Sequence, residues 1–136
     1  MVGLMYLVDT NVFLEILLDQ ENADNAERFL RETSPSELAV SDFSVYSIGI
    51  ILSRQKKHGV FREFVEDVLL RGGLSLLRLT PFDFESLVEA SRKFHLDFDD
   101  AYQYTLARKY GLRIVSYDSD FDTTDIGRVT PLQAMR

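Results

Sequence analysis

The chain contains no cysteine, and its two histidines, His58 and His95, stand far apart. The lack of cysteine excludes a disulfide framework and a thiolate metal site, and two isolated histidines lack the spacing of zinc ligands. No apolar run approaches the roughly 18 residues that a membrane-spanning helix needs. No basic segment precedes the first apolar residues, so we interpret the start as a buried strand rather than a signal peptide. We therefore expect a cytoplasmic protein that does not contact a membrane.

Positive charge is also scarce, because the chain has 15 Lys and Arg residues but 22 Asp and Glu residues, which gives a net charge of −7. Such a chain does not bind nucleic acid through a basic surface alone. Divalent cations held by carboxylates can still receive phosphate groups, since they invert the local charge. No phosphate-binding loop, glycine-rich dinucleotide motif or serine nucleophile motif is present. These observations leave a carboxylate-based metal site as the chemistry to look for.

The 136 residues show no linker, repeat or low-complexity tract, so we expect residues 1–136 to form a single domain. Continuous apolar runs predict strands at residues 4–8, 37–41, 74–79 and 113–116, with a short fifth strand at 128–129. Helical periodicity predicts helices at residues 12–18, 23–32, 44–57, 60–71, 80–94 and 99–110. Alternation of this kind predicts an α/β fold with a parallel sheet and helices on its faces.

Acidic residues stand where this fold places functional groups, at the carboxyl ends of strands. Asp9 follows the first predicted strand, Asp118 follows the fourth, and Asp100 lies in the first turn of the helix before the fourth. Neighbouring strands would bring these side chains to one crevice. Local alternatives exist, because Asp9 or Asn11 can cap a helix, and Asp97 with Asp100 resembles a capping arrangement.

Asp118, Asp120 and Asp122 alternate in the segment IVSYDSDFD, and turn chemistry alone can explain one or two of them. Carboxylates within about 4 to 6 Å of one another repel unless a cation is present. Oxygen ligands without cysteine or suitably spaced histidine favour Mg²⁺ or Mn²⁺ over zinc. From the residues alone the three aspartates fit a turn as well as a cation site, and we interpret Asp122 as a turn residue.

The stretches LVDTNVFLEIL and DDAYQYTLARKYGLRIVSYDSDF, at this separation, resemble the PIN-domain family and in particular its VapC-type toxin ribonucleases. The resemblance covers nearly the whole chain. It implies a three-layer α/β/α fold with a central parallel sheet of four to five strands. It also implies a Mg²⁺- or Mn²⁺-dependent ribonuclease with an RNA substrate, a small antitoxin partner and a homodimeric state.

Residue by residue, the resemblance implies a metal-binding and catalytic role for Asp9, Asp100 and Asp118, and an auxiliary catalytic role for Asp120. The family's hydroxyl positions match Thr10 and Ser116, and its opening motif is completed by Asn11.

The chain departs from the family pattern at one position. Family members usually carry a Glu in the helix after the second strand, where this chain has Ser47. Asp42, at the end of that strand, could bring a carboxylate into the crevice from a different backbone position. Without such a replacement the site has one ligand fewer, so a catalytically weakened or inactive module that binds RNA or protein is the alternative. A receiver-type phosphotransfer domain fits less well, because the residues after the fourth strand are acidic.

Overall fold

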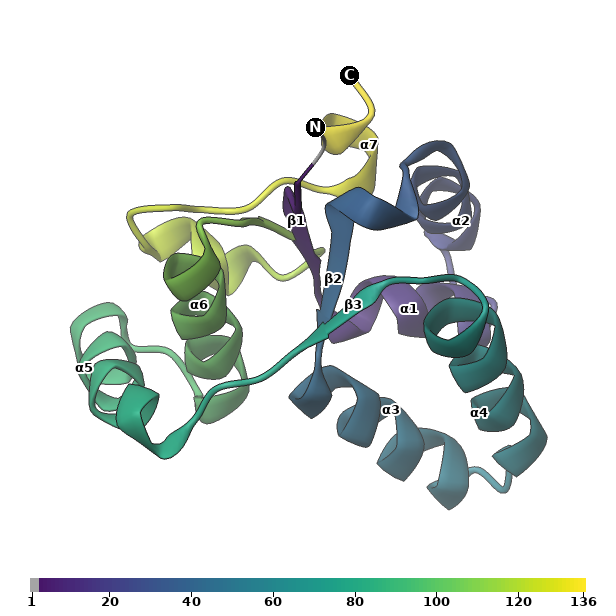
Figure 1. The fold of residues 1–136 in the computed structure, drawn as a ribbon, viewed down its shortest axis with the longest axis horizontal. Coiled ribbons are helices and arrows are strands. Elements are labelled where there is room, and N and C mark those ends of the chain that lie inside the picture. Colours follow the sequence, from purple (N-terminus) through teal and green to yellow (C-terminus); the bar gives the residue numbers. More distant parts are fainter. Residues whose placement is uncertain (1–2) are drawn as a thin grey trace.

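Four short apolar segments form one parallel sheet in the computed structural model, which describes residues 3–136 (Figure 1). The strands are β1 (Tyr6–Val8), β2 (Leu38–Ser41), β3 (Ser75–Leu77) and β4 (Arg113–Val115), in the order β3-β2-β1-β4. All neighbouring pairs are parallel. The predicted fifth strand is instead an isolated parallel bridge between Val115 and Val129. The predicted α/β class with a parallel sheet is therefore confirmed.

The helices lie close to the predicted ranges. The α-helices are α1 (Thr10–Leu17), α2 (Ala23–Glu32), α3 (Asp42–Arg54), α4 (His58–Phe64), α5 (Phe84–Phe94), α6 (Phe98–Tyr110) and α7 (Pro131–Ala134). The shorter 3₁₀ segments are η1 (Pro35–Glu37), η3 (Pro81–Asp83) and η4 (Ser119–Thr123), and a π-helical segment, η2 (Val65–Leu70), continues α4. The predicted helix 60–71 is therefore two segments of different winding.

Successive residues of a strand point to opposite faces, and here each face has its own core. Leu7 of β1 and Ile114 of β4 belong to a core shared with α5 and α6. Their neighbours Val8 and Val115 belong to a second core shared with α1, α2, α3 and α4. Figure 1 shows α5 and α6 on one side of the strands and α1 to α4 on the other. This arrangement confirms the predicted three-layer α/β/α fold.

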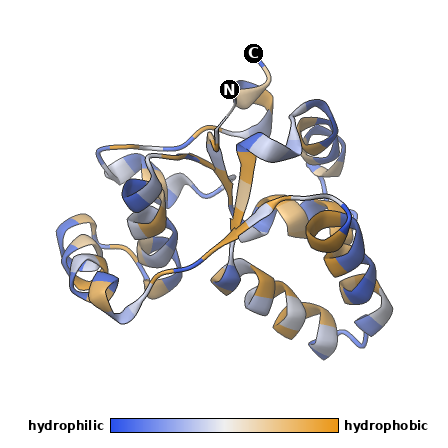
Figure 2. Cartoon of the chain, in the orientation of Figure 1, coloured by the Kyte–Doolittle hydropathy of each residue, from blue (hydrophilic) through white to orange (hydrophobic). Residues whose placement is uncertain are grey.

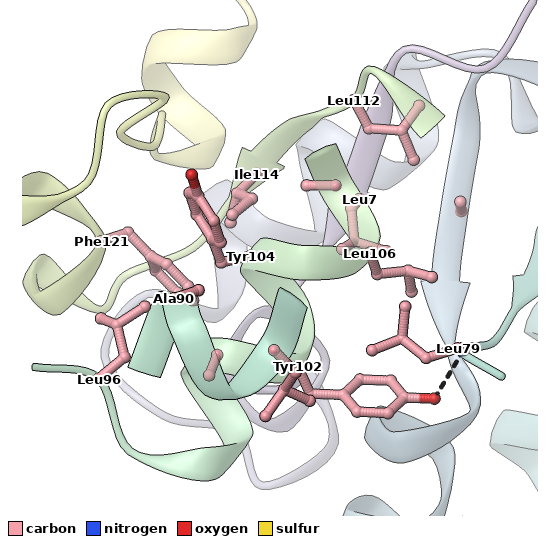
Figure 3. Close-up of a cluster of buried hydrophobic side chains, with 14 residues drawn as sticks. Leu7, Leu79, Ala90, Leu96, Tyr102, Tyr104, Leu106, Leu112, Ile114 and Phe121 are labelled. Carbon is pink, nitrogen blue, oxygen red and sulfur yellow. Dashed lines mark hydrogen bonds between the residues drawn. The ribbon is translucent and has the colours of Figure 1, made fainter. Parts of the chain in front are cut away.

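The hydropathy of the chain follows these layers. Figure 2 shows apolar residues along the central strands, with polar and apolar residues alternating along the helices around them. A fully buried leucine contributes roughly 1.5 to 3 kcal/mol relative to an exposed one. Leu106 of α6 is fully buried in the first core, and the Tyr102 hydroxyl accepts a hydrogen bond from the backbone N–H of Leu79 (Figure 3). These contacts fix α6 against the sheet.

The strand order creates a switch point between β1 and β4. From β1 the chain proceeds to β2 and β3 on one side, and then returns to β4 on the other side of β1. Crossovers on opposite faces open a crevice at the carboxyl ends of the two strands where the direction reverses. The backbone N–H of Asp9 donates to the carbonyl of Val115 at 2.9 Å, so the ends of β1 and β4 meet there. Within the described residues, no helix is both long and apolar enough to span a membrane.

Candidate metal centre

Asp9 lies at the end of β1, and its carboxylate accepts four hydrogen bonds. Oδ1 accepts from the backbone N–H of Thr10 and from Nε2 of Gln103, each at 2.9 Å. Oδ2 accepts from Oγ of Ser116 at 2.6 Å and from Nδ2 of Asn11 at 3.3 Å. The carboxylate therefore caps α1, as one interpretation expected, and also connects α1, α6 and the end of β4.

The Asp9 side chain is 6% exposed, and this burial raises its pKa above the ordinary value. Hydrogen bonds from Ser116, Gln103 and Thr10 oppose the rise, whereas the charge of Asp118 adds to it. A cap alone does not require such burial. A buried carboxylate beside a second one is typical of a site that receives a cation.

Asp100, Asp118 and Asp120 form a group of three acids in which one carboxylate oxygen of each lies within 4.8 Å of the others. Asp100 comes from the first turn of α6, and Asp118 precedes η4, where its carboxylate accepts the backbone N–H of Asp120 at 2.8 Å. Asp97 occupies the N-cap position of α6 without a side-chain capping bond, so Asp100 is not part of a capping box. The acids predicted from the segment IVSYDSDFD and from α6 do converge.

The environment of Asp100 strongly disfavours its ionised form. The side chain is 5% exposed, and this burial is the largest cause of a rise in its pKa to about 8. The charges of Asp118, Asp99 and Asp9 raise it further. A cation placed among these carboxylates would remove this repulsion.

Asp9 lies outside the three-acid group but shares a cavity with two of its members. This cavity of about 500 Å³ is lined by Asp9, Asp100 and Asp118, among others. Asp120 instead lines an adjacent hollow with Lys93 and His95. Asp122 pairs with Arg128 at 3.2 Å, which agrees with its interpretation as a turn residue outside the site.

The donor set of the site fits a hard divalent cation. The residues lining the 500 Å³ cavity, all from the described part of the chain, include no Lys, Arg or His to neutralise its acids. Three carboxylate oxygens within 4.8 Å match the oxygen ligands that Mg²⁺ and Mn²⁺ prefer.

The PIN domain family model matches residues 6–127. The chain belongs to the PIN domain family. No curated protein sequence matches the chain.

Solved structures share the fold at low sequence identity. VapC20 of Mycobacterium tuberculosis, described as a sarcin–ricin loop cleaving toxin, is 19% identical with a TM-score of 0.78, over 93% of this chain and 99% of its own. FitAcB of Neisseria gonorrhoeae is 20% identical, with a TM-score of 0.72 over 94% and 99%. A toxin–antitoxin complex of Klebsiella pneumoniae is 17% identical, with a TM-score of 0.72 over 93% and 97%. These likenesses support the PIN fold.

Ser47, the position at which the resemblance led us to expect a Glu, lines the cavity. The suggested replacement by Asp42 is wrong. Oδ1 of Asp42 accepts the hydroxyl of Tyr102 and the backbone N–H of Phe43, each at 2.7 Å, and Asp42 does not line the cavity. These two donors direct the Asp42 carboxylate toward α6 and its own helix start, so Asp42 does not bring a carboxylate to the cavity beside Ser47.

Gln103 of α6 is a site residue that was not predicted from the sequence. It is 2% exposed, and its Nε2 donates to Asp9 and, at 2.8 Å, to Oγ of Ser44. The Thr10 hydroxyl also donates to Ser44 Oγ at 2.8 Å, so a polar network supports Asp9 from behind. Oε1 of Gln103 is buried and has no hydrogen-bond partner among residues 3–136. Gln103 lies three residues after Asp100, which places both side chains on one face of the helix. This spacing is the feature of the sequence that could have indicated Gln103 as a site residue.

Proposed function

We propose that this PIN domain is a Mg²⁺- or Mn²⁺-dependent endoribonuclease that hydrolyses phosphodiester bonds in RNA. The observation that carries the proposal is the convergence of Asp100, Asp118 and Asp120 within 4.8 Å, beside the buried carboxylate of Asp9. PIN domains are usually metal-dependent nucleases, so the family supports this chemistry. In this proposal Asp9, Asp100 and Asp118 bind the metal, and Asp120 assists as an auxiliary acid.

A bound divalent cation would supply Lewis acidity, which polarises the scissile phosphate and lowers the pKa of water. The chain supplies the positions of the ligands. Ser116 donates to Asp9 Oδ2 while its Oγ accepts the backbone N–H of Asp118 at 2.9 Å, so one hydroxyl sets the spacing of two acids. Asn11 adds a second link, because its Nδ2 donates to Ser116 Oγ at 3.1 Å and its Oδ1 accepts the N–H of Tyr117 at 3.1 Å.

Calorimetry with Mn²⁺, followed by cleavage of a labelled RNA in Mg²⁺ or Mn²⁺, tests this function. The wild type is expected to bind Mn²⁺ and to cleave RNA, and Asp118→Asn is expected to lose both. Asp122→Asn is a matched control, because Asp122 lies in the same segment but pairs with Arg128 outside the cavity. Absence of cleavage by the wild type, with no difference from Asp9→Asn, would exclude the ribonuclease.

Ser47 favours one second candidate, a PIN-like module that binds RNA or a protein with little or no catalysis. Its hydroxyl replaces the expected carboxylate in the wall of the cavity, and the described structure brings no other acid to that place. A wild type that binds RNA without cleaving it, while Ser47→Glu cleaves, would establish this alternative. Mn²⁺ binding that disappears in Asp118→Asn would count against it.

We further propose that residues 1–136 act as one domain, as the toxin of a type II toxin–antitoxin pair, with a small antitoxin as partner and a homodimeric state. Support comes from the Klebsiella pneumoniae neighbour, which is a toxin–antitoxin complex. Exposed apolar side chains on α3 and near the start of α5, such as Tyr46, Ile50 and Phe82, are available for contacts between protein chains. Light scattering of the purified protein tests the dimer, and co-purification with the product of a neighbouring short gene tests the antitoxin.

A further inference from the structure

Residues of two kinds dominate the lining of the 500 Å³ cavity. Four are acidic, namely Asp9, Asp99, Asp100 and Asp118. Four are large and apolar, namely Leu14, Phe43, Ile51 and Phe98. The proposed metal chemistry uses only the acidic residues. Large apolar side chains that line the same cavity therefore require a separate explanation.

Phe98 is the most exposed of these apolar residues. Its side chain is 57% exposed, although it is the first residue of α6 and lies two positions before the buried Asp100. Behind it, the ring centroids of Phe43 and Tyr102 lie 6.0 and 6.3 Å away, and the rings of Phe43 and Tyr102 are stacked at 5.4 Å. The Tyr102 hydroxyl is held by Leu79 and Asp42. Phe98 thus presents a ring to the cavity on a support that is already fixed.

A ribonucleotide combines groups suited to both kinds of lining residue, because it carries a charged phosphate and a flat, weakly polar base. Stacking on an aromatic side chain suits any of the four bases, since each has a π face, and requires that the base be unpaired. The cavity falls within the roughly 300 to 1,000 Å³ range of small-molecule sites. We propose that Phe98, supported by Phe43, is a nucleobase subsite on which one unpaired base of the RNA stacks while its phosphate lies beside the acidic residues of the cavity.

This subsite rests on the proposed ribonuclease function and adds to it a residue that binds the substrate without binding the metal. The uncharged polar residues that line the cavity are Thr10, Asn11, Ser47 and Gln103, and the side chains of Thr10, Asn11 and Gln103 donate hydrogen bonds to other protein groups. Recognition therefore acts through the face of the base rather than its edge. The subsite selects an accessible, unstacked nucleotide and discriminates weakly among the four bases.

The test uses a fluorescein-labelled 12-nucleotide oligouridylate, titrated with the protein in Ca²⁺, which takes carboxylate ligands with looser geometry than Mg²⁺. Phe98→Ala is expected to weaken binding roughly 5- to 150-fold, the range that follows from 1 to 3 kcal/mol for loss of one stacked base. Phe98→Tyr keeps a ring and is expected to bind within about twofold of the wild type. Phe82→Ala is the matched control, because Phe82 is 95% exposed but does not line the cavity.

A series of oligouridylates with one abasic position identifies the stacked base. An oligonucleotide that is abasic at the stacked position should bind the wild type as weakly as the intact oligonucleotide binds Phe98→Ala. The abasic oligonucleotide should bind Phe98→Ala no more weakly than this, because both changes remove the same interaction. Equal effects of Phe98→Ala and Phe82→Ala would overturn the subsite. So would a dimer that dissociates in Phe98→Ala, since the ring would then belong to a contact between two copies of the chain.

Mn²⁺ calorimetry separates this inference from the proposed function. Phe98→Ala is expected to bind Mn²⁺ as the wild type does, because its ring carries no metal ligand. If the wild type binds Mn²⁺ and cleaves RNA while Phe98→Ala binds the oligonucleotide equally well, the subsite alone is wrong. If the wild type neither binds Mn²⁺ nor cleaves RNA, the proposed function fails and the subsite fails with it.

Discussion

Replacing Asp100 by Asn is expected to stabilise the protein at pH 8 when no divalent cation is present. Burial, and after it the charges of Asp118, Asp99 and Asp9, raises the pKa of Asp100 to about 8 from an ordinary value of 3.8. In the unfolded chain the same carboxyl ionises near the ordinary value. Between these two pKa values the folded state holds one proton more than the unfolded state, so the free energy of unfolding falls as the pH rises.

The magnitude follows from the width of this pH window. Each pH unit inside it removes ~1.4 kcal/mol from the free energy of unfolding. Between pH 5 and pH 8 the wild type should therefore lose ~3.6 kcal/mol through this one group, slightly less than three full steps because the folded group is already half ionised at pH 8. Asn at position 100 carries no titrating proton and resembles the protonated acid. Asp100→Asn should therefore match the wild type near pH 5 and exceed its stability by ~3.6 kcal/mol at pH 8.

Urea unfolding followed by far-ultraviolet circular dichroism measures this difference, since the chain has no tryptophan for fluorescence. The titrations are made at pH 5, 6, 7 and 8 with excess chelator, and Asp97→Asn serves as a control for the loss of an exposed acid at the start of α6 that does not contribute to the raised pKa of Asp100. Addition of Mn²⁺ at pH 8 should restore stability to the wild type and much less to Asp100→Asn, because a ligand stabilises only the state that binds it. A wild type whose stability is flat or rises between pH 5 and pH 8 in chelator would refute the reasoning.

Three further substitutions test separate parts of the structure. Gln103→Leu removes a hydrogen-bond donor to Asp9 together with the unpaired Oε1. We expect its free energy of unfolding to stay within ~2 kcal/mol of the wild-type value. Its Mn²⁺ affinity, measured by calorimetry, should be lower by roughly 10- to 100-fold. Ser47→Glu places a carboxylate in the cavity wall and should raise Mn²⁺ affinity roughly tenfold while lowering the melting temperature in chelator. Tyr102→Phe leaves the N–H of Leu79 without its partner and should cost ~1 to 3 kcal/mol in urea unfolding.

The elements and the strand-end acids were predictable because they depend on local pattern. Continuous apolar runs and Asp residues directly after them can be seen along the chain without any tertiary contact. The order β3-β2-β1-β4 could not be derived in this way, because no local pattern states that β4 lies beside β1. The approach of Asp118 to Asp9 followed only if β1 and β4 are neighbours, and they are.

Side-chain direction was the part that the sequence could not supply. Asp42 stands at a strand end like Asp9, yet its carboxylate turns to the hydroxyl of Tyr102, which lies 60 residues further along the chain. Gln103 was overlooked for the related reason that its partners, Asp9 and Ser44, come from other segments. A residue whose role depends on distant partners is visible only after the helix is packed on the sheet.

The hydrogen bonds around Asp9 explain how the fold holds several acids in one crevice. Its four donors come from α1, α6 and the end of β4, and the bonds from Gln103 and Ser116 also join Asp9 to the segments that carry Asp100 and Asp118. Asp100 has no comparable set of donors, and the repulsion among the acids therefore appears mainly in its raised pKa. Ser47 in place of a Glu lowers the number of like charges in the cavity and with it this repulsion. We infer that Ser47 in place of a Glu lowers the metal affinity and raises the stability of the metal-free protein. Ser47→Glu should therefore raise the metal affinity and lower that stability.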